Sequence, residues 1–335
     1  MTSAAVVGVI ANPLAGKDIR RLVAEASPTS DMAKVGIVRR AVIGAVEGGA
    51  RRVILADDRR GIAYRAIDGL DLDADLEVLD EPILDSGRNS QRAAGWCCDE
   101  GAGAVIVLGG DGTHRDVAKG WRDAPLVALS TGTNNVFPRQ MEATVAGHAA
   151  GLVASGQVCL TEASNQAKVI NVEVEGVEGD ADMALVDVAL VTNTFTASRA
   201  VWDAASLREL VAAIAEPATV GLSAVAAALA PTGRRDPGGV HVKFGPGESV
   251  RAPLAPGLYA EVEVAEHQRL DWDESIEVAG PGSLSFDGER DVALKPGQTA
   301  SLHITNDGPL VIDVDKTMLV SATTALEKRK TPDGC

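Results

Sequence analysis

The chain has 335 residues, 46% hydrophobic and 23% charged, a composition that is typical of a globular protein and excludes disorder as its main state. At roughly 100–200 residues per domain, this length predicts two domains. The formal charge of −16 argues against nucleic acid or an anionic membrane as a partner, because both repel an acidic surface. The start of the chain lacks the basic and apolar regions of a signal peptide, and no apolar stretch is long enough to cross a bilayer, so we expect a soluble, cytoplasmic protein.

Strand-like and helix-like segments alternate over residues 1–150, which predicts a Rossmann-like α/β domain with a parallel sheet. The expected strands are Ala5–Ala11, Arg52–Ala56, Leu76–Leu79, Ala104–Leu108 and Leu126–Leu129. The expected helices are Asp18–Ala26, Met32–Val46, a helix capped by Asp85 or Ser86 that runs to about Glu100, one beginning near His114, and Gln140–Ser155. The strand Ala104–Leu108 is the clearest, since its continuous β-branched run is typical of a strand covered on both faces.

The pattern changes after about Glu162. Apolar and polar residues alternate in Val169–Val177 and Ala260–Val264, with turns rich in Gly and Pro between such segments. This predicts a β-rich, sandwich-like domain over 151–312, with inserted helices at Ser198–Ala215 and Ala218–Ala230. The tail, 313–335, has helical character, and we expect it to return to the first domain.

The strongest candidate for a functional site is the loop after the strand Ala104–Leu108. Gly109, Gly110 and Gly112 surround Asp111, and Thr113 follows. Glycines let the backbone approach a phosphate closely, and the carboxylate beside it could accept a proton from a hydroxyl group or bind Mg²⁺ through water. The alternative is an ordinary turn from a strand into a helix.

Two further loops follow predicted strands. Asn12 to Lys17 contains Gly16 and Lys17, but it departs from a P-loop because Ala11 and Asp18 replace the first Gly and the Ser or Thr. Gly132 precedes the polar residues Thr133, Asn134 and Asn135. Each could be a plain structural turn. Ligands of open α/β sheets bind beyond the carboxyl ends of the strands, so we expect the three loops to form one site.

The order Asn-Pro-x-x-Gly-Lys, Gly-Gly-Asp-Gly-Thr and Gly-Thr-x-Asn resembles the superfamily of NAD kinases, diacylglycerol kinases and sphingosine kinases. The longer strings ANPLAGKDIRRLV, LGGDGTHRDVAKGW and LSTGTNNVFP are most similar to the ATP-NAD kinase-like proteins of the acetoin catabolism protein X group. Two looser matches follow, EPATVGLSAVAAAL and FDGER, so the resemblance covers nearly the whole chain.

This resemblance implies an ATP-dependent kinase with a nucleotide cleft between the two domains. Asp111 would be the catalytic base or the group that organises Mg²⁺. The residues that would line the nucleotide are Asn12, Gly109 to Thr113, Thr133 and Asn135. Asp287 and Glu289, from FDGER, would assist at the domain junction. By analogy with NAD kinases, we expect a homo-oligomer.

The acceptor of the phosphoryl group is left open by departures from these families. Val136 replaces the lipid kinases' Asp, and the NAD kinases' Asn-Glu pair has an approximate counterpart at Val186-Asp187. The NAD ribose is the favoured acceptor, and a small polyol or hydroxyketone linked to acetoin catabolism is the alternative. A nucleotide-binding regulator without catalysis is the competing function.

We assign no catalytic role to two further sets of residues. We expect His114 to be an exposed residue at the start of a helix. Arg199, Trp202 and Asp203 could line an acceptor pocket, but a Trp packed into the core is the simpler interpretation.

Overall fold

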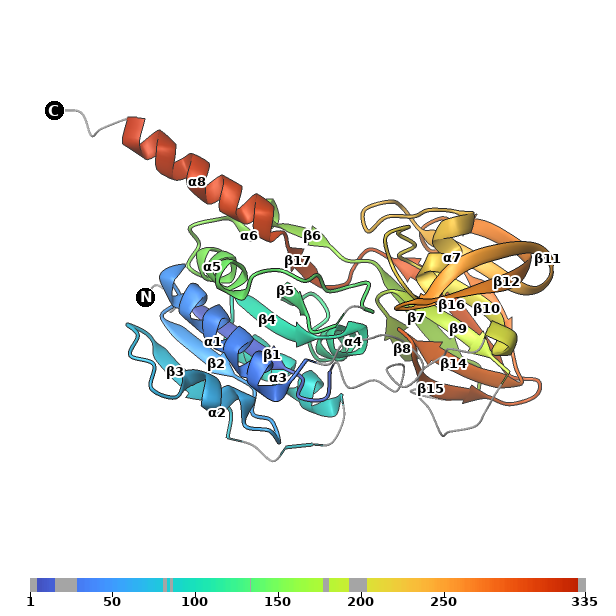
Figure 1. Ribbon diagram of the computed structural model, residues 1–335, viewed down its shortest axis with the longest axis horizontal. Helices are drawn as coiled ribbons and strands as arrows, with labels where there is room; N and C mark the ends of the chain where they lie inside the picture. Colours follow the sequence, from blue (N-terminus) through green and yellow to red (C-terminus); the bar gives the residue numbers. More distant parts are fainter. Residues whose placement is uncertain are drawn as a thin grey trace.

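The computed structural model describes residues 5–15, 29–80, 83–84, 87–132, 134–176, 181–192 and 204–330. It consists of a part built on a parallel sheet and a β-rich part beside it (Figure 1). The predicted helix Asp18–Ala26 and the predicted helix caps Asp85 and Ser86 lie outside the described residues.

The first sheet has seven strands in the order β3-β2-β1-β4-β5-β17-β6, and β6 alone among these seven runs antiparallel to its neighbour. The strands are β1 (Val6–Ala11), β2 (Arg52–Leu55), β3 (Asp75–Val78), β4 (Ala104–Gly109), β5 (Pro125–Ser130), β6 (Ser164–Gln166) and β17 (Leu310–Ile312). The order of the first five is that of a Rossmann fold, with the topological switch point between β1 and β4. The predicted fold class is confirmed for this part.

Helices cover both faces of this sheet. One face packs against α1 (Asp31–Glu47), α2 (Ile62–Ile67) and α5 (Ala143–Ala154), and the other against α3 (Arg88–Asp99) and α4 (Asp111–Gly120). Helix α4 begins at Asp111 and not near His114, because Gly110 adopts the extended backbone conformation that precedes a first helical turn.

The β-rich part consists of two antiparallel sheets, ordered β12-β11-β10-β9-β14-β15 and β13-β16-β7-β8. Their strands are β7 (Val169–Val174), β8 (Ala181–Ala184), β9 (Asp187–Val191), β10 (Leu207–Ala212), β11 (Gly239–Ala255), β12 (Leu258–Leu270), β13 (Ile276–Ala279), β14 (Gly282–Phe286), β15 (Glu289–Leu294) and β16 (Thr299–Thr305). One apolar core contains buried residues of both sheets, and α7 (Leu222–Leu229) packs on the other face of the larger sheet. This arrangement confirms the predicted β-rich sandwich and the second of its two predicted helices, Ala218–Ala230.

The prediction of a helix at Ser198–Ala215 is wrong for the residues that the structure describes there, 204–215. Residues 198–203 lie outside the described part, and Leu207–Ala212 forms strand β10 between β9 and β11. Leu, Arg, Glu and Ala favour a helix locally, but pairing on both sides outweighs this weak preference. One such contact joins the buried His241 on β11 to Glu209 on β10, with 2.9 Å between Nε2 and Oε2.

The end of the chain returns to the parallel sheet. Strand β17 pairs with β5, and helix α8 (Val314–Lys330) follows it and contacts α5 and the short helix α6 (Leu160–Ala163) (Figure 1). The division into 1–150, 151–312 and 313–335 stays a prediction. Within the described residues, no helix is long and apolar enough to cross a membrane.

Helices α1 and α5 pack closely against each other, because glycines line their contact. A Cβ atom on Gly147 would overlap the carbonyl oxygen of Ala41, and one on Gly44 would overlap that of Thr144. Gly36, also within α1, is different, since a Cβ there would meet only the end of the Arg40 side chain, at 3.5 Å. Small residues therefore set the distance between the two helices that cover this face.

Replacing Gly147 by Ala should lower the free energy of unfolding by about 1–3 kcal/mol, because backbone atoms must move apart to admit the methyl group. The matched control, Gly36→Ala, should raise it by about 0.5–1 kcal/mol, because alanine is the better helix former. Urea unfolding of both variants measures the difference. Equal effects of the two changes would contradict the close packing.

Candidate active site

The loops after β1, β4 and β5 meet at the carboxyl edge of the parallel sheet, as predicted. The side-chain amide of Asn12, after β1, donates a hydrogen bond of 2.9 Å to Oγ1 of Thr113, in the first turn of α4. The backbone amide of Asn12 also donates to the carbonyl oxygen of Leu108, at 3.0 Å. Gly16 and Lys17, the other predicted residues of this loop, lie outside the described residues.

The glycines at the end of β4 and just after it leave little room for side chains. A Cβ atom on Gly109 would lie 2.5 Å from the Cβ of Thr113, and one on Gly110 would lie 3.0 Å from Oδ1 of Asn135. The Gly110 carbonyl then accepts the amides of Thr113 and His114, which closes the first turn of α4. The result is a helix N-terminus preceded by the half-buried Gly110, an arrangement suited to binding a phosphate.

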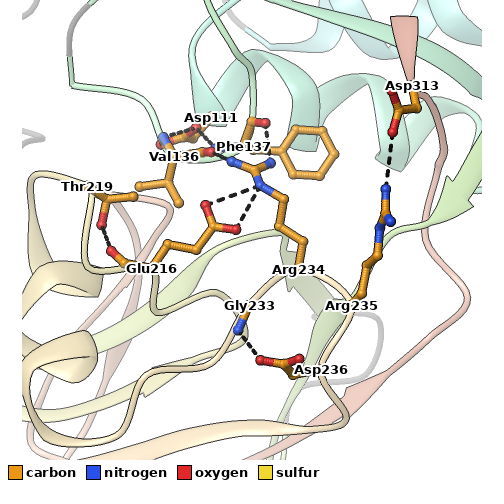
Figure 2. A network of polar contacts seen from close by, with 10 residues as sticks. All are labelled: Asp111, Val136, Phe137, Glu216, Thr219, Gly233, Arg234, Arg235, Asp236 and Asp313. Carbon is orange, nitrogen blue, oxygen red and sulfur yellow. Dashed lines mark hydrogen bonds and ion pairs between the residues drawn. The ribbon is translucent and has the colours of Figure 1, made fainter. Parts of the chain in front are cut away.

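Asp111 is the first residue of α4, and its carboxylate bonds to the segment after β5. Oδ1 accepts the backbone amides of Val136 at 3.0 Å and Phe137 at 2.8 Å, and Oδ2 accepts that of Val136 at 3.1 Å (Figure 2). Two N–H donors, one of them shared between both oxygens, stabilise negative charge on this carboxylate and fix its orientation. Among the described residues, Asp111 therefore joins the glycine loop to the loop after β5.

The loop after β5 is held together by Ser130. Its Oγ accepts a hydrogen bond of 2.7 Å from the side-chain amide of Asn135 and one of 3.2 Å from the backbone amide of Gly132. Asn134 is half-buried, and Thr133 lies outside the described residues. Of the predicted polar residues here, Asn135 is the one that the structure places directly against the glycine loop.

His114 is buried, which corrects the prediction of an exposed histidine. Its side chain is 0% exposed and its Nδ1 lies 2.8 Å from the carbonyl oxygen of Gly110. Since a carbonyl can only accept, Nδ1 carries the proton of the neutral ring. Burial lowers the pKa of His114 from 6.5 to about 4. This burial has no local pattern in the sequence, because the residues that cover the ring, including Phe137, are distant in the chain.

A second acidic cluster lies in the β-rich part. Asp287 has a positive φ of 50°, and its buried carboxylate accepts the backbone amides of Leu185, Val186 and Asp187 at 2.8–3.2 Å. Burial raises its pKa. Its carboxylate therefore holds the turn between β8 and β9, and the role at the domain junction that the resemblance implied stays a prediction.

Asp187 itself faces a side chain. Its Oδ2 lies 3.5 Å from Oγ of Ser223, which lies at the start of α7 and belongs to the string EPATVGLSAVAAAL. Arg115 of α4 connects this cluster to the glycine loop, since its Nη1 donates to the carbonyl oxygen of Phe286 at 2.9 Å. Glu289 lies at the start of β15, and its side chain is outside the described atoms.

Two buried lysines, which the sequence analysis does not predict, bind backbone carbonyl oxygens in this region. Lys34 of α1 is 0% exposed, and its Nζ donates to the carbonyl oxygens of Pro13 at 2.6 Å and Ala15 at 2.7 Å. Lys168 is 2% exposed and donates to the carbonyl oxygen of Gly238 at 3.0 Å. Burial lowers the pKa of Lys168 to about 8. Both resemble ordinary surface lysines in the sequence, because their partners are backbone oxygens far along the chain.

Acid should destabilise the protein partly through His114. A histidine whose pKa falls from 6.5 to about 4 on folding binds protons more readily when unfolded, so its stabilising contribution is complete above about pH 6.5 and is lost as pH falls toward 4. Between pH 7.5 and pH 5 the loss should be on the order of 2 kcal/mol. Urea unfolding at both pH values should show that His114→Asn lacks this loss, whereas His267→Asn, which alters an exposed histidine, retains it. The same pH dependence in all three proteins would contradict the assignment.

Comparisons with known proteins show which family the chain belongs to. Residues 70–158 match the ATP-NAD kinase N-terminal domain, and residues 168–307 match the acetoin catabolism protein X C-terminal domain. Acetoin catabolism protein X of Cupriavidus necator is 37% identical over 317 residues, which cover 90% of this chain and 88% of that protein. The fold is similar to that of yeast NADH kinase, crystallised with NADH, with a TM-score of 0.53 and 11% identity over 100% of this chain and 91% of that one. The chain therefore belongs to the acetoin catabolism protein X family, and its N-terminal part is that of an ATP-NAD kinase-like protein.

Proposed function

We propose that the protein is a kinase that transfers the terminal phosphoryl group of Mg²⁺-ATP to a hydroxyl group. The observation that carries this proposal is the position of Asp111, fixed by three backbone hydrogen bonds at the start of α4. The carboxylate thus stands beside a glycine-lined helix N-terminus at the switch point of a parallel sheet. Phosphoryl transfer depends mostly on positioning and on neutralising charge, and such a rigid arrangement serves both.

The donor's phosphates would lie against the backbone of Gly109, Gly110 and Gly112, with Asn12 and Asn135 at the sides. Asp111 would orient the attacking hydroxyl group and accept its proton, or hold a water bound to the metal. The match to the ATP-NAD kinase N-terminal domain supports ATP as the donor.

Magnesium is compatible with the residues present. Among the described residues, no group of three or more His, Cys, Asp or Glu side chains could hold a metal ion by itself. Mg²⁺ in kinase sites usually takes most of its ligands from phosphates and water, with one or two carboxylates from the protein. Asp111 fits that role, and the metal would supply neutralisation of the phosphate charge.

NAD is the acceptor that we favour, through a hydroxyl group of its ribose. The fold of yeast NADH kinase and the match to the ATP-NAD kinase domain support it. A small polyol or hydroxyketone is the second candidate, because the position that approximates the NAD kinases' acidic residue is Asp187, which is buried against Ser223.

Asp111→Asn should lower kcat by about 100-fold or more, because removing a proton-accepting or metal-organising group typically costs 100- to 10,000-fold. Asparagine keeps one oxygen that can accept the amide of Phe137, so the loop should retain its shape. Release of ADP from Mg²⁺-ATP, measured with NAD and then with hydroxyketones and polyols, tests this.

The matched control is Asp123→Asn, which changes an exposed carboxylate beyond the end of α4 and should leave kcat unchanged. Full activity of a folded Asp111→Asn variant would refute the role of this residue. Binding of ATP without ADP release for any acceptor would refute the kinase and favour a nucleotide-binding regulator.

A further inference from the structure

Arg234 lies in the loop between α7 and β11 and reaches the site from the β-rich part. Its Nη1 donates to the carbonyl oxygen of Phe137 at 2.6 Å, and its Nη2 donates to that of Val136 (Figure 2). Its Nε lies 3.3 Å from the carboxylate of Glu216. All three guanidinium nitrogens are therefore bonded to protein groups. Arg234 thus connects the β-rich part to the segment after β5, and we assign it no role in binding a phosphate.

The two residues whose carbonyl oxygens Arg234 contacts are the same two whose amides Asp111 contacts. Val136 and Phe137 each donate an amide hydrogen to Asp111 and offer a carbonyl oxygen to Arg234. The short segment is thus bound between a carboxylate and a guanidinium group. Figure 2 shows the chain of contacts from Asp111 through this segment to Arg234 and Glu216.

We propose that Arg234 is a positioning residue: it fixes the Val136–Phe137 segment from the β-rich part and thereby fixes the orientation of the Asp111 carboxylate. A planar guanidinium group with two parallel donors can hold two neighbouring carbonyl oxygens at once, whereas an ammonium group offers a single point charge. Without Arg234 the segment can rotate, and the amide hydrogens that orient Asp111 turn with it.

Glu216 offsets the cost of burying the positive charge of Arg234. Arg234 is 24% exposed, and burial lowers its pKa while the neighbouring Glu216 opposes the shift. The backbone around both residues is itself held, since Thr219 Oγ1 donates to the carbonyl oxygen of Glu216 at 2.6 Å and the amide of Gly233 donates to Asp236 at 2.6 Å. A paired, hydrogen-bonded cation in a fixed loop can define the position of its partner.

The neighbouring arginine provides a matched control. Arg235 bonds to Asp313 at 3.1 Å, and its side chain is 67% exposed, so it carries the same charge without reaching Val136 or Phe137. Arg234→Gln, Arg234→Lys and Arg235→Gln can therefore be compared in the full-length protein. The catalytic part of the inference rests on the proposed kinase activity, but the contact with the segment does not.

Hydrogen exchange of a peptide covering residues 134–141 measures the contact directly, with or without catalysis. In Arg234→Gln, protection of the Val136 and Phe137 amides should fall by about 10-fold or more, because their segment opens more often. Arg234→Lys should restore part of it, and Arg235→Gln should match the wild type. Unchanged exchange in Arg234→Gln would overturn the proposal, even in a protein with no measurable turnover.

Steady-state kinetics measure the consequence for Asp111. Arg234→Gln should lower kcat by about 10- to 100-fold, as a small displacement of a catalytic group does, with the Kd for Mg²⁺-ATP within about threefold of the wild type. Arg234→Lys should recover part of kcat. A structural role alone predicts that Kd, kcat and the unfolding midpoint all deteriorate together without rescue by lysine, and that result would overturn the proposal. No turnover by the wild type with any acceptor would instead refute the kinase, and exchange would still decide whether the contact exists.

Discussion

The hydrogen bonds from the Asp111 carboxylate to the amides of Val136 and Phe137 are the interaction on which the rest of the site depends. A carboxylate can accept from two consecutive amides only if its own backbone comes very close to theirs. The glycines before Asp111 are crowded by side chains, since a Cβ atom on Gly109 would overlap the side chain of Thr113 and one on Gly110 would press against the side chain of Asn135. Because Thr113 in the same turn bonds to Asn12, the loop after β1 is drawn into the same rigid unit. The three loops therefore present their backbone to a ligand in a preorganised arrangement.

Close approach of backbones is also how the chain forms cores with few aromatic residues. Aromatic side chains make up 3% of the sequence, so large rings cannot fill the spaces between layers. Gly44 and Gly147 bring α1 and α5 together instead, and the core beneath them consists mainly of Ala, Val, Leu and Ile. Dense packing of small side chains contributes to stability through many short contacts. The positions of the helices over the sheet, and of the loops that they anchor, follow from this packing.

Features that depend on neighbouring residues could be predicted from the sequence, and those that depend on distant partners could not. The strand ending at Gly109 and the loop around Asp111 are visible because a buried strand and a glycine turn have local patterns. Strand β10 was predicted as a helix, since its Leu, Arg and Glu favour one and its pairing with β9 and β11 leaves no local sign. The burial of Lys34 likewise depends on carbonyl groups that the fold brings to it, and that of His114 on residues distant in the chain such as Phe137.

Asp111 and Asp287 bind the backbone in the same way, but their surroundings differ. Each carboxylate accepts consecutive amides of a neighbouring segment, 136–137 for Asp111 and 185–187 for Asp287. Asp111 does so at a helix N-terminus beside the glycine loop, whereas Asp287 does so at the turn between β8 and β9, near Arg115 of α4, where burial raises its pKa. The first position suits a charged group that acts on a ligand, and the second suits a group that shapes the protein. Asp187, whose carboxylate faces Ser223 instead of backbone amides, is then the acidic residue of this part at which we expect acceptors to be distinguished.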